Sequence, residues 1–175
     1  LDLPMLFYRK DIFVELGLKV PETWDDVESV IRALSENQLE MGFSQALTQI
    51  YMYQSDVDWF KSSYDYENYT GDYTDREYLR TVGVASNLDS NGALDAFQRM
   101  TEWFTLYGEP VTYDFANRFR TGEMPIAIAS YTLYNQLRVF APEIAGLWEF
   151  VQLPGVERED GTINHTSPIT PQAVM

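Results

Sequence analysis

The chain has 175 residues, 45% hydrophobic and 15% aromatic, which is enough to bury one substantial core and predicts a single domain over residues 1–175. Its formal net charge is −15, from 27 acidic and 12 basic residues. This excludes nucleic acid as a partner and disfavours an anionic membrane surface, because phosphate groups need clustered lysines and arginines. The sequence has no cysteine, and no apolar run is long enough for a membrane span or a retained secretory leader.

The first predicted elements are a strand and a short helix. Residues 6–8, Leu-Phe-Tyr, are a β-prone run. Asp11 is suited to cap a helix that begins at Ile12, and Gly17 suits the end of that helix. Pro21 then prevents the helix from continuing.

A helix-start box follows at residues 23–26, Thr-Trp-Asp-Asp. The Thr23 hydroxyl can accept a backbone N–H bond, and the two aspartates lie at the positive end of the helix dipole. The next apolar residues recur at the spacing i, i+3, i+4, i+7. This spacing predicts one buried stripe, made by Val27, Val30, Ile31 and Leu34.

The stretch after residue 41 is less regular. Residues 42–47 predict a second short strand that runs into a loop, and residues 49–60 favour a helix. Residues 62–75 are polar, acidic and rich in tyrosine, which indicates an irregular segment with turns.

Another amphipathic helix is predicted after Asn91-Gly92, and Gly108 and Pro110 close it. We expect its apolar face to comprise Leu94, Phe97, Met100, Phe104 and Tyr107.

The last third of the chain alternates helices and strands. Residues 112–120 predict a short helix that buries Phe115 and Phe119, with Gly122 at its end. Residues 126–129 are apolar throughout, which is typical of a strand buried on both faces. The predicted helix 131–140 and strand 148–153 follow, so we expect an α/β fold with a small central sheet flanked by helices.

Two blocks of this pattern resemble a known family. The first contains Tyr8-Arg9-Lys10-Asp11, Gly17-Leu18, Pro21 and Thr23-Trp24-Asp25-Asp26, and the second runs from Phe119 to Ser130 and on to Leu153-Pro154-Gly155. They resemble the extracellular solute-binding proteins of ABC importers, in the branch that includes maltose-binding protein. Three details depart from the family pattern: Arg9 for Asn, Asp26 for Glu and Met124-Pro125 for Ala-Met.

The resemblance implies a specific organisation. Family members usually run to twice this length and fold into two α/β lobes, with the ligand in the cleft between them. It implies that this chain is one lobe, the C-terminal-type lobe inserted in the middle of the parent sequence, with both chain ends near the hinge and the second lobe absent. It further implies an extracellular or periplasmic location, a leader with a lipid anchor outside this chain, and the membrane permease subunits as partners.

Ligand contacts in open α/β sheets come from loops at the carboxyl ends of strands. One such loop holds Ser130, Tyr131, Thr132 and Tyr134, where sugar-binding relatives carry Gly-x-Trp with a stacking aromatic ring. Here Ser130 replaces the Gly and Thr132 the Trp, while the tyrosines supply aromatic faces and the amides of the next helix can bind a polar group. The loop after the second strand adds amide and hydroxyl groups suited to a carbohydrate: Ser44, Gln45, Thr48, Gln49 and Tyr51.

Other functions have weaker support. The only histidine, His165, has no accompanying nucleophile motif, and no phosphate-binding loop is present, so we expect neither an enzyme nor a cofactor. The acidic residues of 62–75 do not match a calcium loop, so we expect no metal. The alternative is an extracellular adhesion or scaffold module that binds a protein partner through exposed tyrosines. Seven aromatic residues of the middle of the chain also suit an aromatic carbohydrate surface, because flat rings with polar edges fit sugars: Tyr51, Tyr53, Trp59, Tyr64, Tyr66, Tyr69 and Tyr73.

Overall fold

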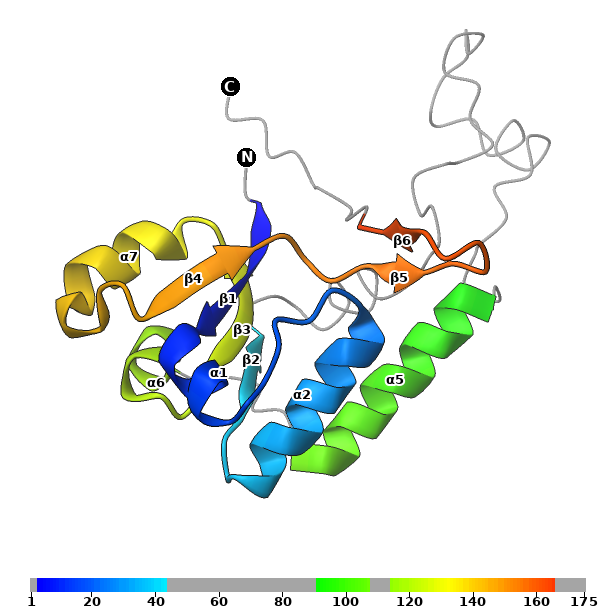
Figure 1. The fold of residues 1–175 in the computed structure, drawn as a ribbon, viewed down its shortest axis with the longest axis horizontal. Coiled ribbons are helices and arrows are strands. Elements are labelled where there is room, and N and C mark those ends of the chain that lie inside the picture. Colours follow the sequence, from blue (N-terminus) through cyan, green and yellow to red (C-terminus); the bar gives the residue numbers. More distant parts are fainter. Residues whose placement is uncertain (1–2, 44–90, 108–113, 166–175) are drawn as a thin grey trace, which may run out of the picture.

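A four-stranded sheet with helices on both faces forms the centre of the computed structural model, which describes residues 3–43, 91–107 and 114–165 (Figure 1). The strand order is β2-β3-β1-β4. The strands are β1 (Pro4–Arg9), β2 (Met41–Phe43), β3 (Ile126–Ser130) and β4 (Trp148–Val151). This arrangement confirms the predicted α/β fold with a small sheet flanked by helices.

The two faces of the sheet are covered by different helices. One face packs against α1 (Lys10–Glu15), α2 (Trp24–Glu36) and α5 (Asn91–Tyr107). The other face packs against α6 (Phe115–Thr121) and α7 (Leu133–Phe140). A short 3-10 turn, η2 (Pro142–Ile144), follows α7, and β5 (Val156–Glu157) pairs with β6 (Ile163–Asn164) beyond the sheet.

Strand direction determines which loops meet. β1 runs antiparallel to both β3 and β4, whereas β2 runs parallel to β3. The carboxyl ends of β2, β3 and β4 therefore share one edge of the sheet with the amino end of β1. We call this end of the strands the open edge. The opposite end, where β1 finishes, is called the closed edge.

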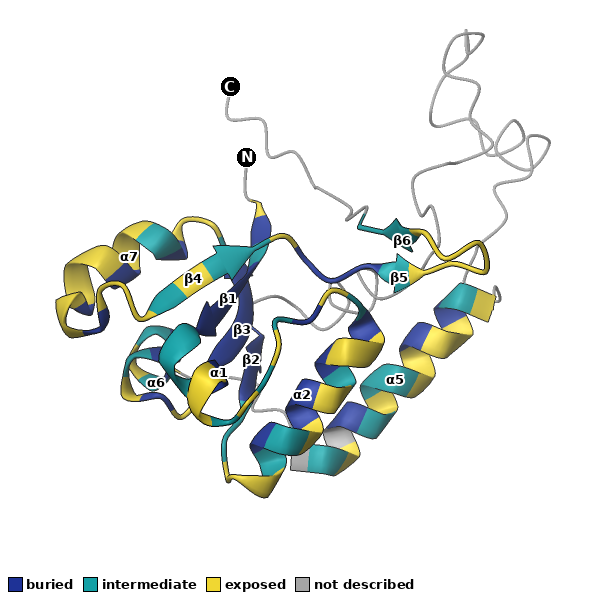
Figure 2. Cartoon of the chain, in the orientation of Figure 1, coloured by how far each residue is buried: buried dark blue, intermediate teal, exposed yellow. Residues whose placement is uncertain are grey.

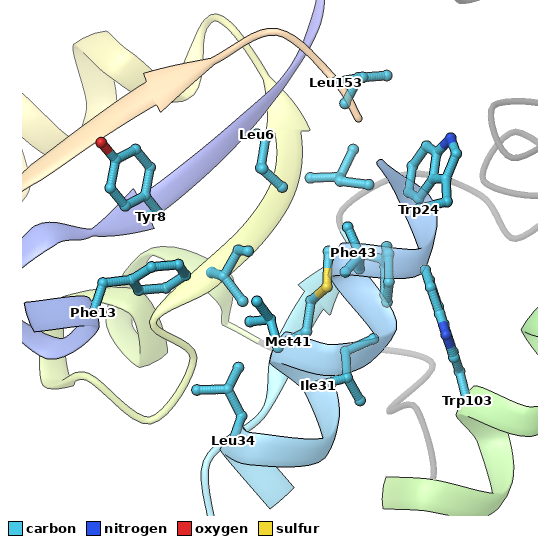
Figure 3. Close-up of a cluster of buried hydrophobic side chains, with 14 residues drawn as sticks. Leu6, Tyr8, Phe13, Trp24, Ile31, Leu34, Met41, Phe43, Trp103 and Leu153 are labelled. Carbon is cyan, nitrogen blue, oxygen red and sulfur yellow. The ribbon is translucent and has the colours of Figure 1, made fainter. Parts of the chain in front are cut away.

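The core divides into two clusters because side chains alternate along each strand. Ile126 and Ile128 of β3 point toward α2, while Ala127 and Ala129 point toward α6 and α7. Figure 2 shows β3 buried along most of its length, which confirms the prediction of a strand covered on both faces. Figure 3 shows the larger cluster, to which α2 contributes several side chains and α5 contributes Trp103.

Helix α2 begins and packs as predicted. The Thr23 hydroxyl accepts a hydrogen bond from the Asp26 N–H at 3.1 Å, and the Asp26 carboxylate accepts one from the Thr23 N–H at 2.9 Å. This reciprocal capping box satisfies amides that the helix itself leaves free. The predicted stripe is buried together with the first helical residue: Trp24, Val27, Val30, Ile31 and Leu34.

The two blocks that carry the family resemblance are bonded to each other. Gly155 N–H donates to the carbonyl of Glu22 at 2.9 Å, and Trp24 N–H donates to the carbonyl of Gly155 at 3.1 Å. A Cβ atom at residue 155 would lie 2.4 Å from Ile163 Cγ2, so no side chain fits there without a shift. The Leu-Pro-Gly segment after β4 thus fixes the amino end of α2.

The predicted cap of the first helix is wrong. Helix α1 begins at Lys10, two residues earlier than expected, and its N-cap residue, Arg9, makes no side-chain cap bond. The Asp11 carboxylate instead binds the Arg9 guanidinium, at 2.9 Å and 2.7 Å. Two parallel hydrogen bonds to a cationic guanidinium hold the Asp11 carboxylate there, away from the cap position. Gly17 follows the helix with φ = 66°, as its predicted place at the helix end requires.

The predicted apolar face of α5 is also wrong at its first two residues. Leu94 and Phe97 are 56% and 66% exposed, and the buried residues are Ala93, Ala96 and Trp103. Ala93 and Ala96 allow α5 to lie close to α2, and Trp103 packs against Trp24 of α2. The side chains of Phe104 and Tyr107 lie outside the described part.

The remaining predicted elements agree with the structure in type. The helix expected over 112–120 is α6, where Asp114 caps the first turn and Gly122 ends it with φ = 88°. The elements expected over 131–140 and 148–153 are α7 and β4. The expected strand 42–47 is described only as β2, and residues 44–75 lie outside the described ranges. Within those ranges, no helix is long and apolar enough to cross a membrane.

Candidate functional site

The loop after β3 is anchored at the open edge. Ser130 is paired with Pro4 in the sheet, and Tyr131 N–H donates to the carbonyl of Leu3 at 2.8 Å. The predicted residues Ser130, Tyr131, Thr132 and Tyr134 therefore lie on a segment tied to the start of β1. Phe43 ends β2 at the same edge, so the chain enters the second predicted loop from there.

Two hydroxyl groups lie together in this loop. Ser130 Oγ and Thr132 Oγ1 are 2.7 Å apart, and Thr132 N–H donates to Ser130 Oγ at 3.2 Å. Thr132 is exposed and Ser130 half-buried, so both hydroxyls are within reach of a solute. The amides of Tyr134 and Asn135 already donate to carbonyls of the loop. Because these first-turn amides are already bonded, the hydroxyl groups are the main hydrogen-bonding groups that the site offers.

Two tyrosine rings lie next to the hydroxyls. Tyr131 and Tyr134 stack with an interplanar angle of 3° and ring centroids 6.0 Å apart. Phe150 of β4 meets both rings edge-on, at 5.4 Å and 5.9 Å. Such aromatic contacts contribute about 0.5–1.5 kcal/mol each beyond burial, so they hold the rings in place. Tyr131 remains 43% exposed and offers surface to a ligand.

A groove of about 500 Å³ runs between α7 and β4 and begins at Tyr134. Trp148 meets the Tyr134 ring edge-on at 5.8 Å, and the Arg138 guanidinium carbon lies 5.5 Å from the centre of that ring. The groove is lined by Tyr134, Leu137, Arg138, Ala141, Pro142, Ala145, Gly146, Trp148, Glu149 and Phe150. Two smaller cavities, of about 280 Å³ between α6 and α7 and about 210 Å³ between α2 and α5, contain no predicted site residue.

Sequence reasoning located part of this site and missed another part. It placed Tyr131 and Tyr134 at the end of β3, and the structure brings them together with Ser130 and Thr132. It missed the aromatic residues of β4 and Arg138, because only the fold places β4 beside α7. The available signal was the alternation in Trp148-Glu149-Phe150, which puts both aromatic rings on one face.

The other predicted site residues lie outside the described ranges: Ser44, Gln45, Thr48, Gln49 and Tyr51. The aromatic and acidic residues of 51–75 do so as well, which leaves the adhesion hypothesis without a structural observation. Among the residues that the structure describes, no group of three or more His, Asp or Glu side chains is placed to hold a metal ion.

Tyr8 of β1 bonds to Glu149, a residue of the groove lining, from the opposite face of the sheet. The Tyr8 hydroxyl donates to Glu149 Oε2 at 3.1 Å. Burial, followed by this hydrogen bond and the nearby negative charge, raises the pKa of Tyr8 above its ordinary value. The Glu149 carboxylate is thereby turned toward Tyr8 and the larger core cluster.

Comparison with known proteins adds a family assignment. The family model described as bacterial extracellular solute-binding protein matches residues 3–149. That range includes the capping box of α2, all four strands of the central sheet up to Glu149, and the Ser130–Tyr134 loop. Comparison with curated protein sequences finds no match.

Solved structures share the fold. An ABC transporter solute-binding protein from Thermotoga lettingae, bound with α-D-tagatose, is 20% identical with a TM-score of 0.60, over 95% of this chain and 40% of that chain. The sugar-binding protein MalE from Xanthomonas citri is 20% identical with a TM-score of 0.61, over 88% and 38%. A solute-binding protein from Agrobacterium vitis with bound D-mannitol is 18% identical with a TM-score of 0.59, over 87% and 36%.

These likenesses establish the architecture at low sequence identity. The chain spans 36–40% of the length of the three solved proteins. The likeness therefore covers only part of each of those three proteins.

Proposed function

The chain belongs to the family of bacterial extracellular solute-binding proteins, and we propose that it helps to hold a carbohydrate for delivery to the permease of an ABC importer. In this proposal it is the C-terminal-type lobe of a two-lobed protein, and the solute lies between it and a second lobe. The share of the solved relatives that it spans, 36–40%, supports this placement. The family is extracellular, so the proposed location is the periplasm or the outer surface. The proposal includes a lipid anchor carried by a leader.

The observation that carries the proposal is the meeting of hydroxyls and stacked rings at the open edge. Sugars present polar hydroxyls around a ring whose C–H faces are apolar, so they suit aromatic faces beside hydrogen-bonding groups. Tyr131 is the exposed member of the ring pair, and Tyr134 and Phe150 hold it in place. We assign Tyr131 the stacking role that a Trp at residue 132 has in sugar-binding relatives. Ser130 and Thr132 would bind sugar hydroxyls, together with Ser44, Gln45, Thr48, Gln49 and Tyr51 from the second loop.

The mechanism follows from two lobes joined by a hinge. Closure buries the solute and presents a closed surface to the permease. The solute drives closure only as far as it binds the closed form better than the open form. No bond of the solute is made or broken, so this chain would not act as an enzyme, and a separate importer subunit would hydrolyse ATP.

The test is solute binding by the full-length polypeptide, because half of a two-lobed cleft is expected to bind weakly. Thermal unfolding is measured with panels of carbohydrates, peptides and polyamines, followed by calorimetric titration of each hit. We expect a carbohydrate to raise the melting temperature, since a ligand that binds only the folded state stabilises it. Tyr131→Ala should weaken that binding roughly tenfold, in line with about 1.4 kcal/mol of aromatic contact.

Phe97→Ala is the matched control, because Phe97 is a comparably exposed aromatic residue on α5, on the opposite face of the sheet. It should leave affinity unchanged. Failure of every carbohydrate, or binding of a peptide or polyamine instead, would contradict the proposal.

A further inference from the structure

Arg138 on α7 differs from other arginines in the described part of the chain. Each of five others lies 2.5–3.0 Å from a carboxylate oxygen: Arg9, Arg32, Arg99, Arg118 and Arg120. Arg138 makes no such ion pair with a described residue, and its Nη1 contacts only the Tyr134 hydroxyl, at 3.4 Å. In a chain with 27 acidic residues, an exposed guanidinium without a carboxylate beside a groove is a candidate anion site.

Arg138 is the one cationic side chain among the residues that line the groove. Glu149 is the second charged residue of the lining, but its carboxylate accepts the Tyr8 hydroxyl hydrogen bond. Leu6 and Tyr8 belong to the cluster on the α2 face, whereas Trp148 and Phe150 pack on the α7 face. Side chains alternate along β4, so the Glu149 side chain is directed away from Arg138.

The edge strand β4 adds hydrogen-bonding groups to the groove. Lys10 N–H donates to the Leu147 carbonyl at 2.7 Å, and Tyr8 is paired with Glu149 two residues further along. In an antiparallel ladder the bonded pairs alternate, so the backbone groups of Trp148 and Phe150 point away from β1. β4 has no strand on that side in the described sheet, which leaves these N–H and C=O groups for a ligand.

A continuous row connects the groove to the open edge. Tyr131 stacks on Tyr134, and Arg138 lies one helical turn beyond Tyr134 on the same side of α7. The volume of about 500 Å³ lies within the usual range of ligand sites, roughly 300–1,000 Å³. An oligosaccharide that stacks on Tyr131 would therefore reach Arg138 with its next sugar unit.

We propose that the groove between α7 and β4 binds an acidic sugar unit, a hexuronate, whose carboxylate pairs with Arg138. The C–H face of the sugar would lie against Tyr134 and Trp148, and its hydroxyls would bond to the outward backbone groups of β4. This inference rests on the proposed function, because it names the class of carbohydrate that the same site takes. The solute is then a uronate-containing oligosaccharide.

The experiment compares acidic trisaccharides with their neutral methyl esters on the full-length polypeptide. Calorimetric titrations use three pairs: trigalacturonate, triglucuronate and trimannuronate, each with its ester. We expect at least one acid to bind roughly tenfold more tightly than its ester, because only the acid forms a charge-assisted pair with Arg138. Raising the salt concentration should weaken binding of the acid and leave the ester unaffected.

Arg138→Gln should lower the affinity for that acid roughly tenfold and leave the ester within about twofold. Arg32→Gln is the matched control, because Arg32 is an exposed arginine on α2 that pairs with Glu28. Equal affinity for acid and ester in all three pairs, or an equal loss of both in Arg138→Gln, would overturn the inference. Binding of neutral sugars alone would overturn only this inference, whereas the absence of any carbohydrate binding would overturn the proposed function as well.

Discussion

The polar side chains at the two edges of the central sheet differ in their burial and in their hydrogen bonding. At the closed edge, Arg9 is 7% exposed, and its guanidinium donates four hydrogen bonds, to Asp11 and to the carbonyls of Phe119 and Arg120. At the open edge, Ser130 and Thr132 bond to each other and stay accessible to solvent. The comparison separates a buried polar residue that holds the fold, Arg9, from an exposed one that a ligand can reach, Thr132.

Departures from the family pattern have different meanings at the two edges. Arg9 replaces an Asn at the closed edge and links β1, α1 and the end of α6. The cation also lies at the carbonyl end of α6, where the helix dipole is negative. At the open edge, Ser130 and Thr132 replace Gly and Trp. We therefore expect the first departure to affect stability and the second to affect the choice of solute.

The largest expected effect that tests this comparison comes from Arg9→Met. It leaves two carbonyls and the partly buried Asp11 without their donor, and breaking such a network costs about 3 kcal/mol of unfolding free energy. Arg138→Met, at the exposed arginine of α7, should change the unfolding free energy by less than about 0.5 kcal/mol. Urea denaturation of both variants measures the difference, and equal losses would remove the distinction between the edges.

The sequence predicted best those features that depend on neighbouring residues. The capping box of Thr23 and Asp26 and the stripe of α2 require only local spacing, so both were confirmed. The role of Asp11 was mispredicted because its partner Arg9 is itself fixed by carbonyls of α6, more than a hundred residues away. The face of α5 was mispredicted because helix contact favoured Ala93 and Ala96 over larger apolar residues.

In the candidate site, too, the residues that depend on local sequence could be predicted and those that depend on the fold could not. The position of Tyr131 and Tyr134 after a buried strand could be predicted, since ligand loops follow strand ends. The contribution of Phe150, Trp148 and Arg138 could not, because it depends on β4 pairing with β1 and lying beside α7. Sequence spacing gives the contents of a loop, whereas strand order decides which loops and rings meet.

A second test examines Thr23, which lies beside Gly155 in the segment after β4 and whose hydroxyl is bonded within the chain. Thr23→Ala removes one half of the capping box, and we expect a loss of about 1 kcal/mol in unfolding free energy. Ser29→Ala is the control within α2, because the Ser29 hydroxyl only bonds back to the carbonyl of Asp25. Urea denaturation should show the loss only for Thr23→Ala. A drop in sugar affinity without a loss of stability would instead assign Thr23 to the ligand site.

The smallest expected effect is the pH dependence of the closed edge. The hydrogen bonds and charge of Arg9 lower the pKa of Asp11 below its ordinary value of 3.8. A lowered pKa in the folded state means that the unfolded state binds a proton first as the pH falls. The contribution to stability is therefore complete above pH 3.8 and is lost as the pH falls through the pKa of the folded state.

The Asp11 side chain is 34% exposed, so solvent screens the pair and keeps the effect small. Carbon NMR of the carboxyl groups measures it directly, since Arg9→Met should return the pKa of Asp11 toward its ordinary value. Asp26 is the internal control, because backbone hydrogen bonds from Thr23 lower its pKa independently of Arg9. An unchanged pKa of Asp11 in Arg9→Met would mean that the guanidinium does not hold the carboxylate, and the closed edge would then lack its central contact.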